Sequence, residues 1–167
     1  MTRVVLVPGV LALLPEYAGV EDPVAELRAA CLTAVAWLEG DVAVLGDAQG
    51  MRVGESLLSA AGVSRLASLA PQPPRAYLVV GNGSAKRTEK APGHFDERAE
   101  AFDAALGESL RSGRPAVDVG LARELWASVD GIVELGELDG RLGEAQVDYE
   151  DAPYGVAYWV MRWTSDS

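Results

Sequence analysis

Three short apolar runs, each ended by a glycine, constrain the fold of this chain more than any other feature. They are residues 3–7 (RVVLV, before Pro8-Gly9), residues 41–45 (DVAVL, before Gly46) and residues 77–80 (YLVV, before Gly81). Short runs that are rich in β-branched residues and apolar throughout are typical of strands buried on both faces. Because a helical pattern with short joints separates the first two runs, we expect parallel strands in a right-handed βαβ unit.

The segment between the first two runs predicts an amphipathic helix. Asp22 is expected to cap this helix and Pro23 to take its first position, where the missing N–H costs nothing. Its apolar face, with steps of three and four residues, consists of Val24, Leu27, Cys31, Val35 and Leu38. Cys31 is the only cysteine, and this position predicts a small buried hydrophobe instead of a reactive thiol.

Three more helices follow from apolar spacing and capping residues. One spans residues 52–61 and is closed by Gly62, a second opens near Phe95, and a third is capped by Asp118. The positions expected to face inward are Phe95, Ala99, Phe102, Leu106 and Leu110 in the second helix, and Ala122, Leu125, Trp126 and Val129 in the third. We expect residues 46–50 to form a loop, and residues 131–143 to hold a weak helical turn and a loop.

The C-terminus predicts an antiparallel strand pair, residues 145–149 and 156–163, joined by the turn at residues 151–155. The second strand is apolar on both faces, so it should lie in the interior of the sheet. Prolines at 71, 73 and 74 indicate a stiff connection but no domain boundary. The prediction is one α/β domain over residues 1–167, with a mixed, mostly parallel sheet flanked by helices and a C-terminal antiparallel pair.

Charge and hydropathy limit the partners. The formal net charge of −11 argues against nucleic acid and anionic membranes, since both require a basic face. No apolar run approaches the length of a membrane span, and Pro8 and Pro15 interrupt the N-terminal run, which does not resemble a signal peptide. We therefore expect a cytoplasmic protein without a membrane partner.

The candidate site lies in residues 77–103, where a buried strand leads through a charged, glycine-rich loop into a helix. Ligands of α/β folds gather where parallel strands end and helices begin. The residues predicted to line such a pocket are Asp47, Asn82, Ser84, Lys86, Arg87, Glu89 and His94. The loop does not match a phosphate-binding motif, because Pro92-Gly93 intervenes before the helix. A plain turn with locally paired charges is the alternative interpretation.

His94 is the only histidine, which excludes metal centres built on several histidines. It is the one candidate catalytic residue, as a base or with Ser84 and an acid, although no nucleophile-elbow motif surrounds Ser84. Three carboxylates near strand ends, Asp47, Glu150 and Asp151, form the only set considered for a divalent cation such as Mg²⁺. Turn formation alone explains these acids as well, so no cofactor is expected and a divalent metal is the alternative.

Several segments together resemble a family. The opening strand up to Pro8 and the runs DVAVLGD, GNGSAKRTEKAPGHFDERAEAFDAAL and DAPYGVAYWVMRW are similar, in this order, to small bacterial proteins like the catalytic subunit of class III extradiol ring-cleavage dioxygenases. The resemblance implies a mixed α/β fold. It also implies non-haem Fe(II) held at strand ends by two histidines and a glutamate, with a further histidine as acid/base.

The chain departs from that pattern at each histidine. Gly9 stands where the first ligand is expected, Gly46 and Asp47 where the second is, and Ala85 and Lys86 at the acid/base position. Glu150 or Asp151 stands near the expected carboxylate ligand. One histidine cannot supply the two imidazoles of a facial triad, so the metal site is degenerate and ring cleavage is not expected unless a partner chain supplies ligands.

Three functions remain as hypotheses. The first is a dioxygenase-like protein that binds a small molecule or a protein at a strand-end pocket. The second is a metal-dependent enzyme, a hydrolase or an atypical dioxygenase, that uses Asp47 with Glu150 or Asp151 and takes His94 as base. The third is an assembly subunit of a homo- or hetero-oligomer, paired through the apolar C-terminal strand and its tryptophans.

Overall fold

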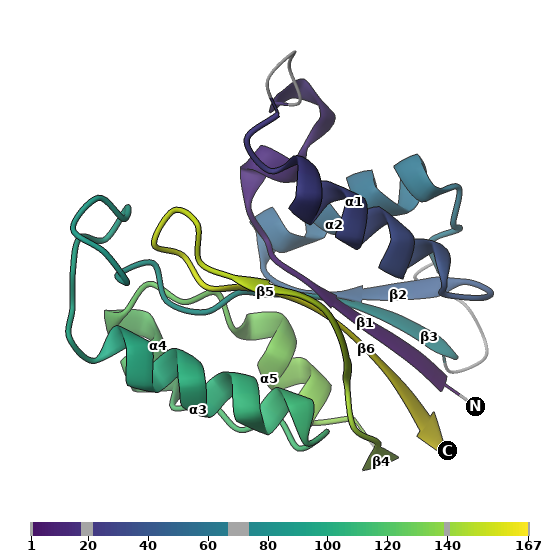
Figure 1. Ribbon diagram of the computed structural model, residues 1–167. Coiled ribbons are helices and arrows are strands. Elements are labelled where there is room, and N and C mark those ends of the chain that lie inside the picture. Colours follow the sequence, from purple (N-terminus) through teal and green to yellow (C-terminus); the bar gives the residue numbers. More distant parts are fainter. Residues whose placement is uncertain (1, 18–21, 67–73, 139–140, 167) are drawn as a thin grey trace.

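The computed structural model describes residues 2–17, 22–66, 74–138 and 141–166. A twisted sheet separates two layers of helices, with α1 and α2 on one face and α3, α4 and α5 on the other (Figure 1). The helices are α1 Ala25–Ala36, α2 Ala48–Ala61, α3 Ala99–Arg111, α4 Val119–Glu124 and α5 Asp130–Gly136, preceded by the short 3-10 turns η1 Leu11–Leu13 and η2 Pro15–Tyr17. This arrangement is the predicted single-domain α/β fold.

In the described residues the sheet has six strands, in the order β2-β3-β1-β6-β4, with β5 also paired to β6. The strands are β1 Thr2–Val7, β2 Val42–Leu45, β3 Ala76–Val80, β4 Arg141–Leu142, β5 Gln146–Asp151 and β6 Tyr158–Asp166. Strands β2, β3 and β1 run parallel, and β6 runs antiparallel to β1, β4 and β5. The mixed sheet, its parallel core and the interior place of β6 are therefore confirmed.

Each face of the sheet has its own core. Side chains of β1 alternate between them: Val5 and Val7 pack with α1 and α2, whereas Val4 and Leu6 pack with α3, α4 and α5. All four are at most 1% exposed, which explains why the strand is apolar throughout. Cys31 belongs to the first core and is fully buried, as the helical spacing predicts.

Helices α1 and α2 do not begin where the sequence predicted. Helix α1 begins at Ala25 without a side-chain cap, so the prediction of Asp22 as cap and Pro23 as first residue was wrong. Asp22 instead accepts from the amide of Val24 in a turn that precedes the helix. Residues 48–50, expected in a loop, form the first turn of α2, because Asp47 caps the helix and accepts a hydrogen bond from the amide of Gly50 at 2.6 Å.

Helix α3 begins later than predicted, at Ala99 and not near Phe95. The Phe95 side chain, which was expected to face inward, is 57% exposed. In the loop that precedes α3, the amide of Asp96 donates to the carbonyl of Lys86.

The helix after Asp118 is also shorter than expected. Asp118 caps α4 as predicted, but the helix ends at Glu124 and Trp126 adopts a left-handed backbone with φ of 61°. This turn directs the Trp126 side chain outward, where it is 57% exposed, although the spacing predicts an inward position. Residues 18–21, which precede α1, lie outside the described residues. So do residues 67–73, which include Pro71 and Pro73 of the predicted stiff connection.

Candidate functional site

The carboxyl ends of the three parallel strands meet as predicted, and their polar groups bond to one another. The amide of Gly9, which follows β1, donates to Oδ1 of Asn82 at 3.3 Å, and Nδ2 of Asn82 donates to the carbonyl of Gly83 at 3.1 Å. Asn82, which follows β3, exchanges backbone hydrogen bonds with Ser128. It is only 5% exposed, so its role here is to join the strand ends.

The side chain of Asp47, which follows β2, also forms hydrogen bonds with residues near the strand ends. Besides the amide of Gly50, its carboxylate accepts from Oγ of Ser128 at 3.0 Å. A Cβ added at Gly50 would lie 3.1 Å from Oδ1 of Asp47 and 3.2 Å from Cβ of Val80. The first turn of α2 therefore packs closely on the end of β3, and the Asp47 carboxylate is used as a structural cap.

The glycine-rich loop leads to a buried carboxylate that the sequence prediction missed. Asp103, on α3 and 3% exposed, accepts from the amide of Ser84 at 2.7 Å and from its hydroxyl at 2.7 Å. It also pairs with Nη1 of Arg87 at 3.3 Å. Burial raises the pKa of the Asp103 carboxyl, while the bonds from Ser84 and Arg87 oppose that rise. Ser84 thus supports a carboxylate and is itself fully buried.

Gly83 makes this approach possible. A Cβ at Gly83 would lie 2.5 Å from Oδ1 of Asp103 and 2.8 Å from Cβ of Ala157, distances that real atoms do not adopt. The signal in the sequence was an acid inside the apolar face of α3, between Phe102 and Leu106. A charged residue in that position needs a partner, and the partner proved to be the predicted loop.

An open hollow lies beside this pair, between α3, the 151–152 turn and the start of β6. Its volume is about 580 Å³, and its apolar lining includes Ala104, Ala157 and Trp159. The charged residues of the lining are Arg87 and Arg111 together with Glu100, Asp103, Glu108, Glu150 and Asp151. Of the predicted site residues, Arg87 and Glu150 meet here, and Asp103 joins them. Asp151 lies at the edge of the hollow, but its register opposite Tyr158 places its side chain on the α1 face of the sheet.

The remaining loop residues lie on the surface outside this lining. The ammonium of Lys86 sits 5.4 Å from the centre of the Trp126 ring, a cation–π distance. Glu89 and His94 are exposed, and His94 adopts a left-handed backbone with φ of 60°. The seven predicted pocket residues therefore divide among the strand ends, the hollow and the surface instead of lining one pocket.

The carboxylates considered for a cation do not come together. Asp47 follows β2, whereas Glu150 and Asp151 end β5, and strands β3, β1 and β6 lie between them. Among the residues that the structure describes, no three His, Cys, Asp or Glu side chains are placed to hold a metal ion. The metal-dependent hypothesis thus lacks the shared site that it requires.

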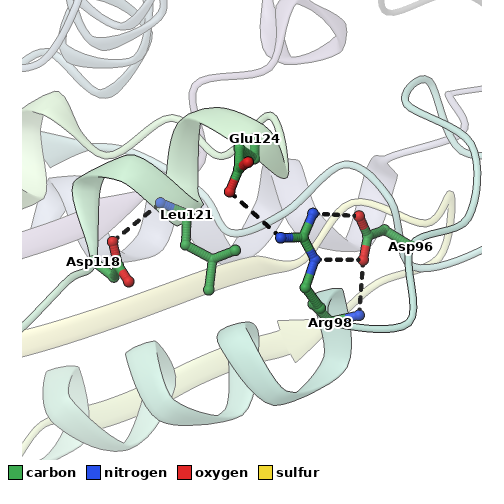
Figure 2. A network of polar contacts seen from close by, with 5 residues as sticks. All are labelled: Asp96, Arg98, Asp118, Leu121 and Glu124. Atoms are coloured by element: carbon green, nitrogen blue, oxygen red, sulfur yellow. Dashed lines mark hydrogen bonds and ion pairs between the residues drawn. The ribbon is translucent and has the colours of Figure 1, made fainter.

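A second, apolar groove of about 550 Å³ lies on the other side of α3, against residues 116–118 and α4, with Phe102 and Leu121 in its wall. At its rim, Figure 2 shows the guanidinium of Arg98 between the carboxylates of Asp96 and Glu124. The hydrogen bonds from Arg98 lower the pKa of Asp96 to about 2. The arginine is thereby occupied, so among the described residues this groove has no cationic anchor comparable with Arg87.

Comparisons with protein-family models and with curated proteins give no match for this chain. No helix in the described part of the chain is long and apolar enough to cross a membrane.

Proposed function

We propose that the protein is a non-catalytic, dioxygenase-like binding protein that holds a small polar molecule in the hollow between α3 and the β5–β6 turn. The observation that carries the proposal is the setting of Arg87. Its side chain lines the hollow, while its only side-chain hydrogen bond among the described residues runs to the buried Asp103. Arginine has five N–H donors in a rigid fork, so most of them stay available to a ligand.

Several features of the surroundings support a binding site. The hollow has the size of small-molecule pockets, about 300–1,000 Å³. A carboxyl with a perturbed pKa lies at its wall, as is common at functional sites. The backbone that carries Arg87 is bonded to the turn before β6, because the amide of Arg87 donates to the carbonyl of Gly155 at 3.0 Å. Such preorganisation lowers the entropy cost of binding.

The proposal keeps the resemblance to class III extradiol dioxygenases and sets aside their chemistry. Where the resemblance places ligand histidines, a Cβ at Gly9 would lie 3.2 Å from Cγ1 of Val80, and Asp47 serves as a helix cap. These positions support packing at the strand ends instead of an iron site. The binding hypothesis therefore has more support here than ring cleavage or a carboxylate-metal enzyme.

The C-terminal strand and its tryptophans, which the assembly hypothesis takes as the interface between subunits, are not at the surface. Strand β6 lies inside the sheet, and its tryptophans Trp159 and Trp163 are 3% and 1% exposed. They are committed to the core and cannot pair across a dimer. A homo-oligomer stays a prediction, but it would need another surface.

Nuclear magnetic resonance tests the proposed site directly. ¹⁵N-labelled protein is titrated with a panel of free amino acids, dicarboxylates, sugars and nucleotides. We expect saturable shifts of the amides of Arg87, Asp103 and Glu150 with at least one compound, lost in Arg87→Gln. Arg52→Gln is the matched control, because Arg52 forms an exposed pair with Glu16 that lies outside the hollow. Shifts confined to other surfaces, or unchanged in Arg87→Gln, would overturn the proposal.

A further inference from the structure

We infer that the hollow recognises a zwitterion, a small molecule that carries both a carboxylate and an ammonium group, such as a free amino acid or a short peptide. This inference rests on the proposed function, since it names the ligand class of the same hollow. Among the described residues, the hollow offers one cationic anchor and one acidic group without an ion pair, and these two groups call for opposite charges on the ligand.

The anchor for the ligand's carboxylate is Arg87. A guanidinium recognises a carboxylate through two parallel hydrogen bonds when its plane is held in place. Here Asp103 holds one end of it, and Asp103 is in turn fixed by two hydrogen bonds from Ser84. The Arg87 side chain is 30% exposed, so the other nitrogens of its guanidinium can reach the hollow while Nη1 is held by Asp103.

The group for the ligand's ammonium is Glu100, in the first turn of α3. It lines the hollow and forms no ion pair with any residue in the described ranges. By contrast, Arg111 is already shared between Glu108 and Glu150. The Glu100 carboxylate gives the hollow a negative group opposite in sign to Arg87.

The balance of charges excludes simpler ligands. Apart from Asp151, whose side chain lies on the other face of the sheet, the lining holds two arginines and four carboxylates. A ligand with only negative groups would therefore meet an excess of like charge. A ligand with only positive groups would cover the donors of Arg87 and leave them unpaired, which costs free energy. A zwitterion satisfies both sides, and its net charge near zero adds no repulsion.

A matched ligand series tests the inference by calorimetry. The probes are L-leucine and L-alanyl-L-alanine, each compared with its N-acetyl form, which lacks the ammonium, and its C-terminal amide, which lacks the carboxylate. We expect at least one zwitterion to bind at least tenfold more tightly than both of its derivatives. The amino acid and the dipeptide distinguish a short from a long separation of the two charges.

Two variants assign the ends of the ligand. In Arg87→Gln, the zwitterion and its amide should bind equally, because the carboxylate has lost its partner. In Glu100→Gln, the zwitterion and its N-acetyl form should bind equally, because the ammonium has lost its partner. Arg52→Gln should keep the wild-type order, and the melting temperature of each variant verifies that it is folded.

The outcomes separate this inference from the proposed function. If the N-acetyl forms bind as tightly as the zwitterions and Arg87→Gln weakens them, the hollow is a binding site but the zwitterion inference is overturned. If no zwitterion binds while another compound shifts Arg87 in the magnetic resonance titration, the inference alone fails. If zwitterions bind and Arg87→Gln changes nothing, both fail.

Discussion

The most informative single residue is Asp103, a carboxylate inside the apolar face of a helix. Its environment combines a desolvation penalty with three stabilising bonds, and the penalty is the larger effect, since the pKa is raised. A buried charge of this kind is costly unless it is paired. It persists here because it organises the loop residues Ser84 and Arg87 around the hollow.

The raised pKa predicts a specific dependence of stability on pH. A carboxyl whose pKa is higher in the folded than in the unfolded chain favours folding below its ordinary value of 3.8, and this contribution is lost as the pH rises through the folded-state pKa. We expect the free energy of unfolding of the wild type to fall with pH relative to Asp103→Asn. Urea unfolding followed by tryptophan fluorescence at a series of pH values measures the difference. A difference that grows with pH would contradict the raised pKa.

Gly83 predicts a steric effect. Because its Cβ would lie 2.5 Å from Asp103 and 2.9 Å from Trp159, Gly83→Ala should reduce the free energy of unfolding by about 2 kcal/mol or more. Gly120→Ala is the control, since the nearest atom to its Cβ is 3.6 Å away and alanine favours the helix that contains it. Chemical denaturation of both variants checks the prediction, which fails if the two are equally stable.

Cys31 predicts an inert thiol. Burial raises the pKa of Cys31 to about 12, so the reactive thiolate is scarce at neutral pH. We expect a thiol reagent to leave the native protein unmodified and to label one group per chain once urea unfolds it. Rapid labelling without denaturant would show that α1 opens locally.

At the scale of elements, the predicted and observed folds agree where the signal is local. Residues 3–7, 41–45 and 77–80 had the composition of buried strands, and each run forms a strand. The burial prediction is wrong for β2, because this strand lies at the edge of the sheet and only Val42 in it is fully buried. The insertion of β3 between β1 and β2 was not visible, because strand order depends on contacts far apart in the chain. The early start of α2 was missed because Asp47 suits a turn and a helix cap equally.

The candidate site shows the same limit. The loop of residues 81–98 was found because its glycines and charges are close in sequence, and it does reach the hollow through Arg87. Asp103 was overlooked because it belongs to a helix face that otherwise predicts core packing. The outward turn of Trp126 could not be foreseen, since a bulky residue rarely adopts a positive φ.

The cap of α2 gives a prediction for a whole element. Asp47→Ala removes two hydrogen bonds, one to the helix and one to Ser128, and should cost about 2 kcal/mol of unfolding free energy. Asp118→Ala removes a single exposed cap bond, to the amide of Leu121, and should cost about 1 kcal/mol or less. Urea denaturation ranks the two, and equal losses would contradict the role given to Ser128.

The same variant separates two functions. If Asp47 were a metal ligand, Asp47→Ala would abolish the response of the melting temperature to Mg²⁺ without a large loss of stability. As a structural cap, it should lower the melting temperature equally with and without Mg²⁺. Differential scanning calorimetry of the wild type and the variant, each with and without the cation, decides between them.

At the scale of the whole molecule, the charge balance sets the response to salt. The chain carries 25 acidic and 14 basic residues, so its net repulsion destabilises the compact state. The ion pairs oppose this, but most of them in the described residues involve exposed side chains, such as Arg52–Glu16 and Arg98–Glu124. Exposed pairs contribute little, about 0–1 kcal/mol each, so the repulsion should dominate.

Salt therefore should stabilise this protein at neutral pH. At about 0.15 M ionic strength the screening length is about 8 Å, which weakens repulsion between distant acids more than the close ion pairs. We expect the melting temperature at pH 7.5 to rise by a few degrees between low salt and this ionic strength. Near the sequence pI of about 4.5 the net charge vanishes, and the rise should disappear. A melting temperature that falls with salt at pH 7.5 would mean that the ion pairs outweigh the net charge.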